Sequence, residues 1–204
     1  DHEHHGHEHG HDDAHDHHHD HGGHAHGPVD PHVWLDPMLV SRMVRHLESR
    51  LVQTFPDEAD AIAQRAEQLR ERLGQLDSSY REQLGSFQGR AIVTYHSAFN
   101  RLADRYGLEV AATLAPIESM GSRSARALNE SLAAIRKHEL KVIFAEPQFD
   151  PAVARSLREQ TGVEVLILDP LGDPHNEERD SYIELMEYNL RTLVKGLRMG
   201  QPGT

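Results

Sequence analysis

Two stretches near the start of the chain carry apolar residues at helical spacing. In the first, Asp36 and Pro37 have the features of an N-cap and a first helical position, and apolar residues then recur every three or four positions until Pro56. In the second, apolar residues recur in the same steps with charged residues between them. The pattern predicts a helix over residues 36–55, then a long amphipathic helix of roughly seven turns over residues 57–85, at the surface or bridging two parts of the protein.

Beyond residue 89, short apolar runs alternate with amphipathic segments. The runs have the length of strands and cover residues 91–95, 108–114, 141–145 and 163–168. Helical spacing predicts helices over residues 97–106, 124–138, 151–162 and 183–197. This order predicts the α/β class, as a Rossmann-like lobe with a four-stranded parallel sheet and helices on both faces.

The first 27 residues differ in composition from everything that follows. They hold 13 of the chain's 18 histidines, 7 acidic residues and no Lys or Arg. Such a composition offers almost no apolar surface for a core, so we expect a disordered tract. Imidazole is a preferred ligand of zinc and its neighbours, which predicts accessory, low-affinity metal binding here. The histidines concerned are His2, His4, His5, His7, His9, His11, His15, His17, His18, His19, His21, His24 and His26.

Two other interpretations of this tract stay open. It is a solvated linker whose metal affinity is incidental, or it is an affinity tag. Tags are usually uniform runs of His, whereas this tract is interleaved with Asp, Glu and Gly, which disfavours the tag.

Charge and cysteine content exclude several classes of partner and site. The net charge is -12, of which the tract supplies -7, so the remainder is about -5. This balance argues against nucleic acid and against an anionic membrane as partner. The chain has no cysteine, hence no disulfide and no thiolate site, and no apolar run approaches the length of a membrane span.

Candidate metal ligands follow three of the four predicted strands. In open α/β sheets, ligands bind at the carboxyl ends of the strands, and these ends carry His96, Glu146 and Asp169. Glu146 precedes Pro147 and a helix start, which favours a role in organising that loop by hydrogen bonds over direct ligation.

His32 lies just before the helix start at Asp36. A helix N-terminus disfavours a charged imidazole and so favours the neutral form that binds metal. A histidine here would equally suit a hydrogen bond to the turn or stacking on Trp34. The sequence leaves both roles open.

The common enzyme motifs are absent. The chain has no G-x-S-x-G elbow, no P-loop and no H-E-x-x-H on a predicted helix. A zinc-dependent hydrolase would need a general base, for which Glu146 is the one reasonable candidate. A zinc-buffering protein that works through the tract alone is a further alternative.

Four motifs carry a family resemblance when taken in order. They are residues 30–37 (DPHVWLDP), 94–99 (TYHSAF, with YGL at 106–108), 144–148 (FAEPQ) and 168–172 (LDPLG). The set resembles the zinc-uptake receptors of bacterial ABC importers, within the periplasmic metal-binding solute receptors. The resemblance covers essentially the whole chain after the tract.

The resemblance implies two α/β lobes joined by one long helix, with the metal bound between them. By it, residues 28–56 are a remnant of the first lobe, 57–85 the linking helix and 86–204 the second lobe. We therefore expect the chain to lack most of the first lobe, its His ligand and a signal peptide. The implied function is that of a monomeric, periplasmic, non-enzymatic receptor that delivers zinc to a membrane permease.

The resemblance also implies a ligand set. His32 and His96 match zinc ligands, and Asp169 matches a carboxylate whose direct ligation varies among zinc-type members. Manganese-type members commonly carry Glu at the position of His96, and imidazole suits zinc better. Zn²⁺ is thus the expected cargo, with manganese or another divalent ion as the near alternative. Glu146 and Trp34 are expected beside the ligands without binding the metal themselves.

Overall fold

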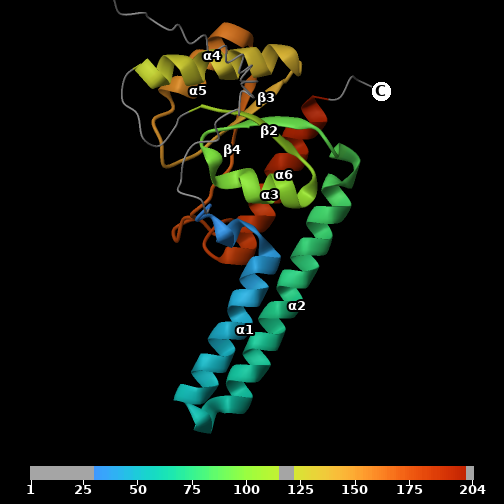
Figure 1. Cartoon of the computed structure of the whole chain (residues 1–204), viewed down its shortest axis with the longest axis vertical. Coiled ribbons are helices and arrows are strands. Elements are labelled where there is room, and N and C mark those ends of the chain that lie inside the picture. The colour runs from blue at the N-terminus through green and yellow to red at the C-terminus, as the bar shows by residue number, and fades with distance from the viewer. Residues whose placement is uncertain (1–29, 115–121, 201–204) are drawn as a thin grey trace, which may run out of the picture.

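The structure is a computed structural model that describes residues 30–114 and 122–200 (Figure 1). The predicted His-rich tract lies outside these residues. The helices are α1 (Pro37–Thr54), α2 (Ala59–Leu84), α3 (Asn100–Tyr106), α4 (Ser122–Lys137), α5 (Ala152–Thr161) and α6 (Tyr182–Met199). The strands are β1 (Ala91–Thr94), β2 (Glu109–Thr113), β3 (Val142–Ala145) and β4 (Glu164–Ile167). Short 3-10 helices cover η1 (Val33–Leu35), η2 (Pro56–Glu58), η3 (Gly85–Phe87) and η4 (Ser97–Phe99).

The strands are hydrogen-bonded as two parallel pairs. β1 pairs with β2, and β3 pairs with β4. β1 also contacts β3, but no ladder joins these two strands. The predicted α/β class with parallel strands is confirmed, whereas the single four-stranded sheet is replaced by two ladders. The strands have only four or five residues, and β1 shifts register between Ile92 and Val93, which increases the local twist.

Helices cover both faces of the strands. Successive strand residues point to opposite faces, so Ile92 and Phe144 join a core with α2, α3 and α6. Val93 and Ile143 face the other way, into a core with α4 and α5. Figure 1 shows α4 and α5 above the strands and α3 below them, while α6 rises from below the strands to the level of β2. The carboxyl ends of the strands are thereby held between two packed layers.

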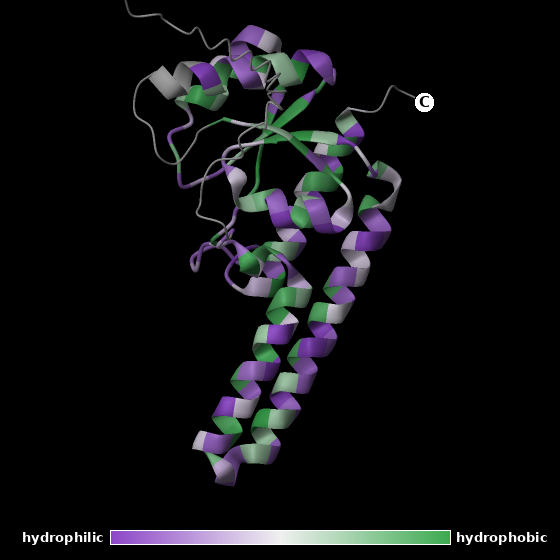
Figure 2. Cartoon of the chain, viewed as in Figure 1, coloured by the Kyte–Doolittle hydropathy of each residue, from purple (hydrophilic) through white to green (hydrophobic). Residues whose placement is uncertain are grey.

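α1 and α2 pack against each other as a hairpin that projects from the lobe (Figure 1). The lobe end of α2 is part of the core, and there the hydroxyl of Tyr80 donates to the Met186 carbonyl at 2.7 Å. Figure 2 shows hydrophobic positions along both helices with hydrophilic ones between them. Farther out, Met43 and Leu47 of α1 are 52% and 59% exposed. Of the helices that the structure describes, none has the length and apolarity needed to cross a membrane.

Helix ends follow the local sequence. The Asp36 carboxylate accepts the backbone N–H groups of Met38 (2.8 Å) and Leu39 (3.2 Å), which confirms the predicted N-cap of α1. Gly107 ends α3 with φ of 74°, a left-handed conformation that glycine adopts without strain. α2 begins two residues later than predicted, because the 3-10 helix η2 precedes it.

Candidate metal centre

The structure brings His32 and His96 together although they are 64 positions apart. Their Nε2 atoms lie 3.4 Å from each other, and their ring centroids are 5.1 Å apart. Both side chains are buried, each residue being 7% exposed. His32 comes from the turn before η1, and His96 from the carboxyl end of β1. Two of the predicted ligands therefore meet at the sheet edge where ligands bind in such folds.

Glu146 contacts both the backbone and the ring of His96. Its Oε1 accepts the backbone N–H of His96 at 3.2 Å and lies 2.6 Å from His96 Nδ1. An anionic carboxylate is only an acceptor, so Nδ1 carries the hydrogen, and in the neutral imidazole that binds metal Nε2 is then the acceptor. Glu146 reaches this place because β3 ends beside β1.

Asp30 holds His32 in the same way. Its Oδ1 accepts the backbone N–H of His32 at 3.0 Å and lies 2.8 Å from His32 Nδ1. The ring of Trp34 meets the imidazole edge-on, with centroids 5.4 Å apart. Sequence reasoning did not single out Asp30. The signal was there, because an Asp two positions before a residue commonly accepts that residue's N–H in a turn.

The spacing of the two imidazoles fits zinc. When neutral rings donate their Nδ1 hydrogens to the carboxylates, both Nε2 atoms carry no hydrogen and are the nitrogens that can bind a metal. Nitrogens bound to tetrahedral zinc at about 2.0–2.1 Å lie about 3.3 Å from each other. The observed Nε2–Nε2 distance of 3.4 Å matches that geometry. Carboxylates on the opposite ring nitrogens are the usual support of zinc-binding histidines.

Asp169 is fully buried, and its carboxylate is engaged elsewhere. Oδ1 accepts from Gln148 Nε2 (2.7 Å) and from the N–H groups of Leu171 (3.0 Å) and Gly172 (3.1 Å). Oδ2 is paired with Arg179 Nη1 at 2.7 Å. These four donors use the acceptor positions that a metal would need.

Asp169 therefore does not join the two histidines in this structure, contrary to the predicted three-ligand set. Among the described residues, no three His, Cys, Asp or Glu side chains form a group that could hold a metal ion. The physical reason is the loop after β4, which folds back and places Arg179 against the carboxylate. Asp169 organises this loop, whereas His32 and His96 are the predicted ligands that the structure brings together.

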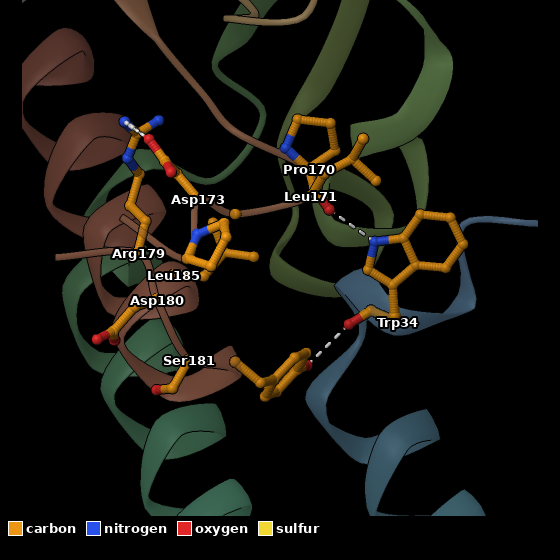
Figure 3. A pocket seen from close by; sticks show the side chains of 11 residues that line it. Trp34, Pro170, Leu171, Asp173, Arg179, Asp180, Ser181 and Leu185 are labelled. Carbon is orange, nitrogen blue, oxygen red and sulfur yellow. Dashed lines mark hydrogen bonds and ion pairs between the residues drawn. The ribbon is translucent and has the colours of Figure 1, made fainter. Parts of the chain in front are cut away.

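The segment that carries His32 is fixed to the far end of the chain. The indole N–H of Trp34 donates to the Pro170 carbonyl, and the Tyr182 hydroxyl donates to the Trp34 carbonyl, each at 2.8 Å (Figure 3). Burial, with a smaller contribution from nearby Asp36, raises the pKa of Tyr182, so its hydroxyl stays a donor. Trp34 and Tyr182 also line a cavity of about 340 Å³ beside the loop after β4.

The fold and the site together define an α/β lobe with a pair of histidines at the carboxyl ends of its strands. Helices cover both faces of the strands, and two carboxylate-backed imidazoles face each other at the strand ends. The family described as "Zinc-uptake complex component A periplasmic" (ZnuA) matches residues 1–196, and the chain belongs to this family. The resemblance read from the four motifs is thereby confirmed.

Relatives with curated names are similar over most of the chain. The zinc-binding lipoprotein AdcA of Streptococcus pneumoniae (strain R6) is 33% identical over 181 residues, which is 84% of this chain and 36% of AdcA. The high-affinity zinc uptake system protein ZnuA of Bacillus subtilis is 31% identical over 172 residues, 83% of this chain and 54% of that protein. The chain thus spans about a third to a half of the length of these relatives.

Solved structures share the fold. The Zn(II)-bound ZnuA-like domain of Streptococcus pneumoniae AdcA has a TM-score of 0.69 at 33% identity, covering 84% of this chain and 65% of that one. The periplasmic zinc-binding protein TroA from Treponema pallidum has a TM-score of 0.70 at 28% identity, covering 82% and 63%.

Proposed function

We propose that this chain belongs to a periplasmic receptor that captures zinc and delivers it to the permease of an ABC importer. The single observation that supports it is the 3.4 Å distance between the Nε2 atoms of two buried histidines, each backed by a carboxylate. In this proposal zinc is cargo, the receptor acts as a monomer, and no reaction is catalysed. Residues 28–56 belong to a first lobe, 57–85 link the lobes, 86–204 form the second lobe, and the histidines of residues 1–27 collect zinc at low affinity.

The chemistry of the pair favours zinc over manganese and a receptor over a hydrolase. Imidazole nitrogens suit zinc, whereas manganese prefers carboxylate, carbonyl and water oxygens. A hydrolase would need Glu146 as a base for a metal-bound water. Glu146 instead lies on the Nδ1 side of the His96 ring, whereas the proposed zinc binds at Nε2.

Zinc titration of the full chain, followed by fluorescence, tests this function. Trp34 is the single tryptophan of the chain and lies against His32, so its emission reports on this site. We expect one tight zinc to change the emission, with manganese competing only at much higher concentration. Deleting residues 1–27 should remove weak sites and keep the tight one. Tighter binding of manganese, hydrolysis of generic ester or phosphate substrates, or zinc binding without any change in emission would contradict the proposal.

Glu146→Gln should weaken zinc binding by about 10- to 100-fold, the usual effect of losing a group that orients a metal-binding histidine. The same change should not lower the free energy of unfolding of the metal-free chain. Glu146 is 3% exposed, and its Oε2 has no hydrogen-bond partner among the described residues, so a neutral amide relieves a buried charge.

For Glu146→Gln, zinc titration measures the zinc affinity, and urea denaturation measures the free energy of unfolding. The matched control is Glu130→Gln, which removes an exposed carboxylate paired with Arg126 on α4 and should leave zinc affinity unchanged. Equal zinc affinities for Glu146→Gln and the control would contradict the orienting role.

A further inference from the structure

Two arginines on α3 face the two aspartates that flank the His32 segment. Arg101 and Arg105 are one helical turn apart, and Asp30 and Asp36 lie on either side of the turn that carries His32. None of these four residues is among the candidate metal ligands. Their contacts therefore need an explanation other than metal binding.

Arg101 holds the start of the segment. Its Nη2 donates to the Asp30 carbonyl at 3.0 Å, and its Nε lies 3.6 Å from Asp30 Oδ2. The other oxygen of the same carboxylate receives the N–H and the Nδ1–H of His32. Arg101 thus fixes the orientation of the group that orients the imidazole.

Arg105 holds the end of the segment. Its Nε lies 3.3 Å from Asp36 Oδ1, the N-cap oxygen of α1, and its guanidinium also binds Asp77 of α2 at 2.8 Å. Burial alone would raise the pKa of Asp77, but hydrogen bonds from Arg81, Arg105 and Tyr106 outweigh burial and lower it. Asp77 therefore stays ionised and keeps Arg105 in place.

α3 also determines where His96 lies. Only the 3-10 helix η4 separates His96 from α3, and η4 is buried throughout. α3 itself is fixed in the core by Leu102, Ala103 and Tyr106. One rigid helix is thus connected to His96 through the backbone and to the His32 segment through two arginines.

We propose that Arg101 and Arg105 are positioning residues that clamp the His32 segment to α3 and so set the His32–His96 spacing for zinc. This inference rests on the proposed function, because the spacing matters only if the two histidines share the ion. Arg101 acts through Asp30, and Arg105 acts through Asp36.

Zinc titration of full-length variants, read from Trp34 emission, tests the clamp. We expect Arg101→Gln and Asp30→Asn each to weaken the tight site about 10-fold. If Arg101 acts through Asp30, the double variant should bind no more weakly than Asp30→Asn alone. Arg105→Gln should weaken binding independently of Asp30. Arg101→Lys, which keeps the charge but lacks the planar fork, should show intermediate affinity.

The control is Arg126→Gln, which removes an exposed ion pair on α4 and should bind zinc as the unaltered chain does. Circular dichroism verifies that each variant is folded, and a general loss of structure would give additive rather than shared losses in the double variant. Unaltered affinity in both Arg101→Gln and Arg105→Gln, or additive losses for Arg101 and Asp30, would overturn the clamp. Absence of a tight site in the unaltered chain would instead overturn the proposed function, so the two failures are distinguishable.

Discussion

Replacing both His32 and His96 with alanine is expected to abolish the tight zinc site and leave the weaker zinc binding of the chain intact. Among the described residues, His32 and His96 are the pair of imidazoles whose Nε2 atoms, the nitrogens that can bind a metal, lie 3.4 Å apart. Carboxylate and water alone hold zinc far less well, because zinc sites in proteins rely on nitrogen and sulfur ligands. Zinc titration against a competing chelator, with Trp34 emission as the second signal, measures the loss.

The matched control replaces two exposed histidines, His46 and His175, in one variant. It removes the same number of imidazoles but leaves the buried pair, so its tight site should be unaltered.

Deleting residues 1–27 gives the opposite test, because it removes 13 imidazoles and should also leave the tight site in place. A tight site that survives the His32/His96 double change but disappears with residues 1–27 would refute the assignment.

Replacing Asp169 with alanine is expected to lower the free energy of unfolding by about 3–5 kcal/mol, even without zinc. The change leaves the guanidinium of Arg179, whose side chain is only 13% exposed, without its 2.7 Å partner. It also removes the acceptor of the Leu171 and Gly172 N–H groups, which hold the loop after β4. Urea denaturation of the metal-free chain measures the effect.

Asp173→Ala is the control for this loop. Asp173 contacts the same arginine at 3.8 Å from a half-exposed position, so its loss should cost less than about 1 kcal/mol. Equal stability of the two variants would show that the Asp169–Arg179 pair contributes little.

Asp169→Asn separates structure from ligation, because it keeps an acceptor oxygen but loses the charge. A large loss of zinc affinity in a stable Asp169→Asn variant would assign Asp169 to the metal after all.

The sequence was sufficient for the class of fold and for part of the site. Alternating apolar runs and amphipathic segments located every described strand, and the rule that ligands gather at strand ends selected His96, Glu146 and Asp169. The rule could not say which of these three side chains would be placed to bind a zinc ion. That depends on hydrogen bonds such as the one from Arg179 to Asp169, which no periodic pattern announces.

The supporting contacts of the site were also hidden from the sequence. Asp30 and Arg101 are 71 positions apart, and a single exposed-looking charge on a short helix gives no sign of its partner. The separation of the strands into two ladders was likewise not predicted, because apolar runs mark strands but do not say which strands share a ladder.

The distance along the chain between His32 and His96 has a thermodynamic consequence. The pair exists only in the folded protein, so zinc that binds there adds RT ln(1 + [Zn]/Kd) to stability, about 2.7 kcal/mol at 100 times Kd. The histidines of residues 1–27 are neighbours in sequence, so we expect them to bind zinc in the folded and the unfolded chain alike and to add little to stability. We therefore expect zinc in the buried pair to raise the unfolding temperature of the full chain, and zinc bound by residues 1–27 to change it little.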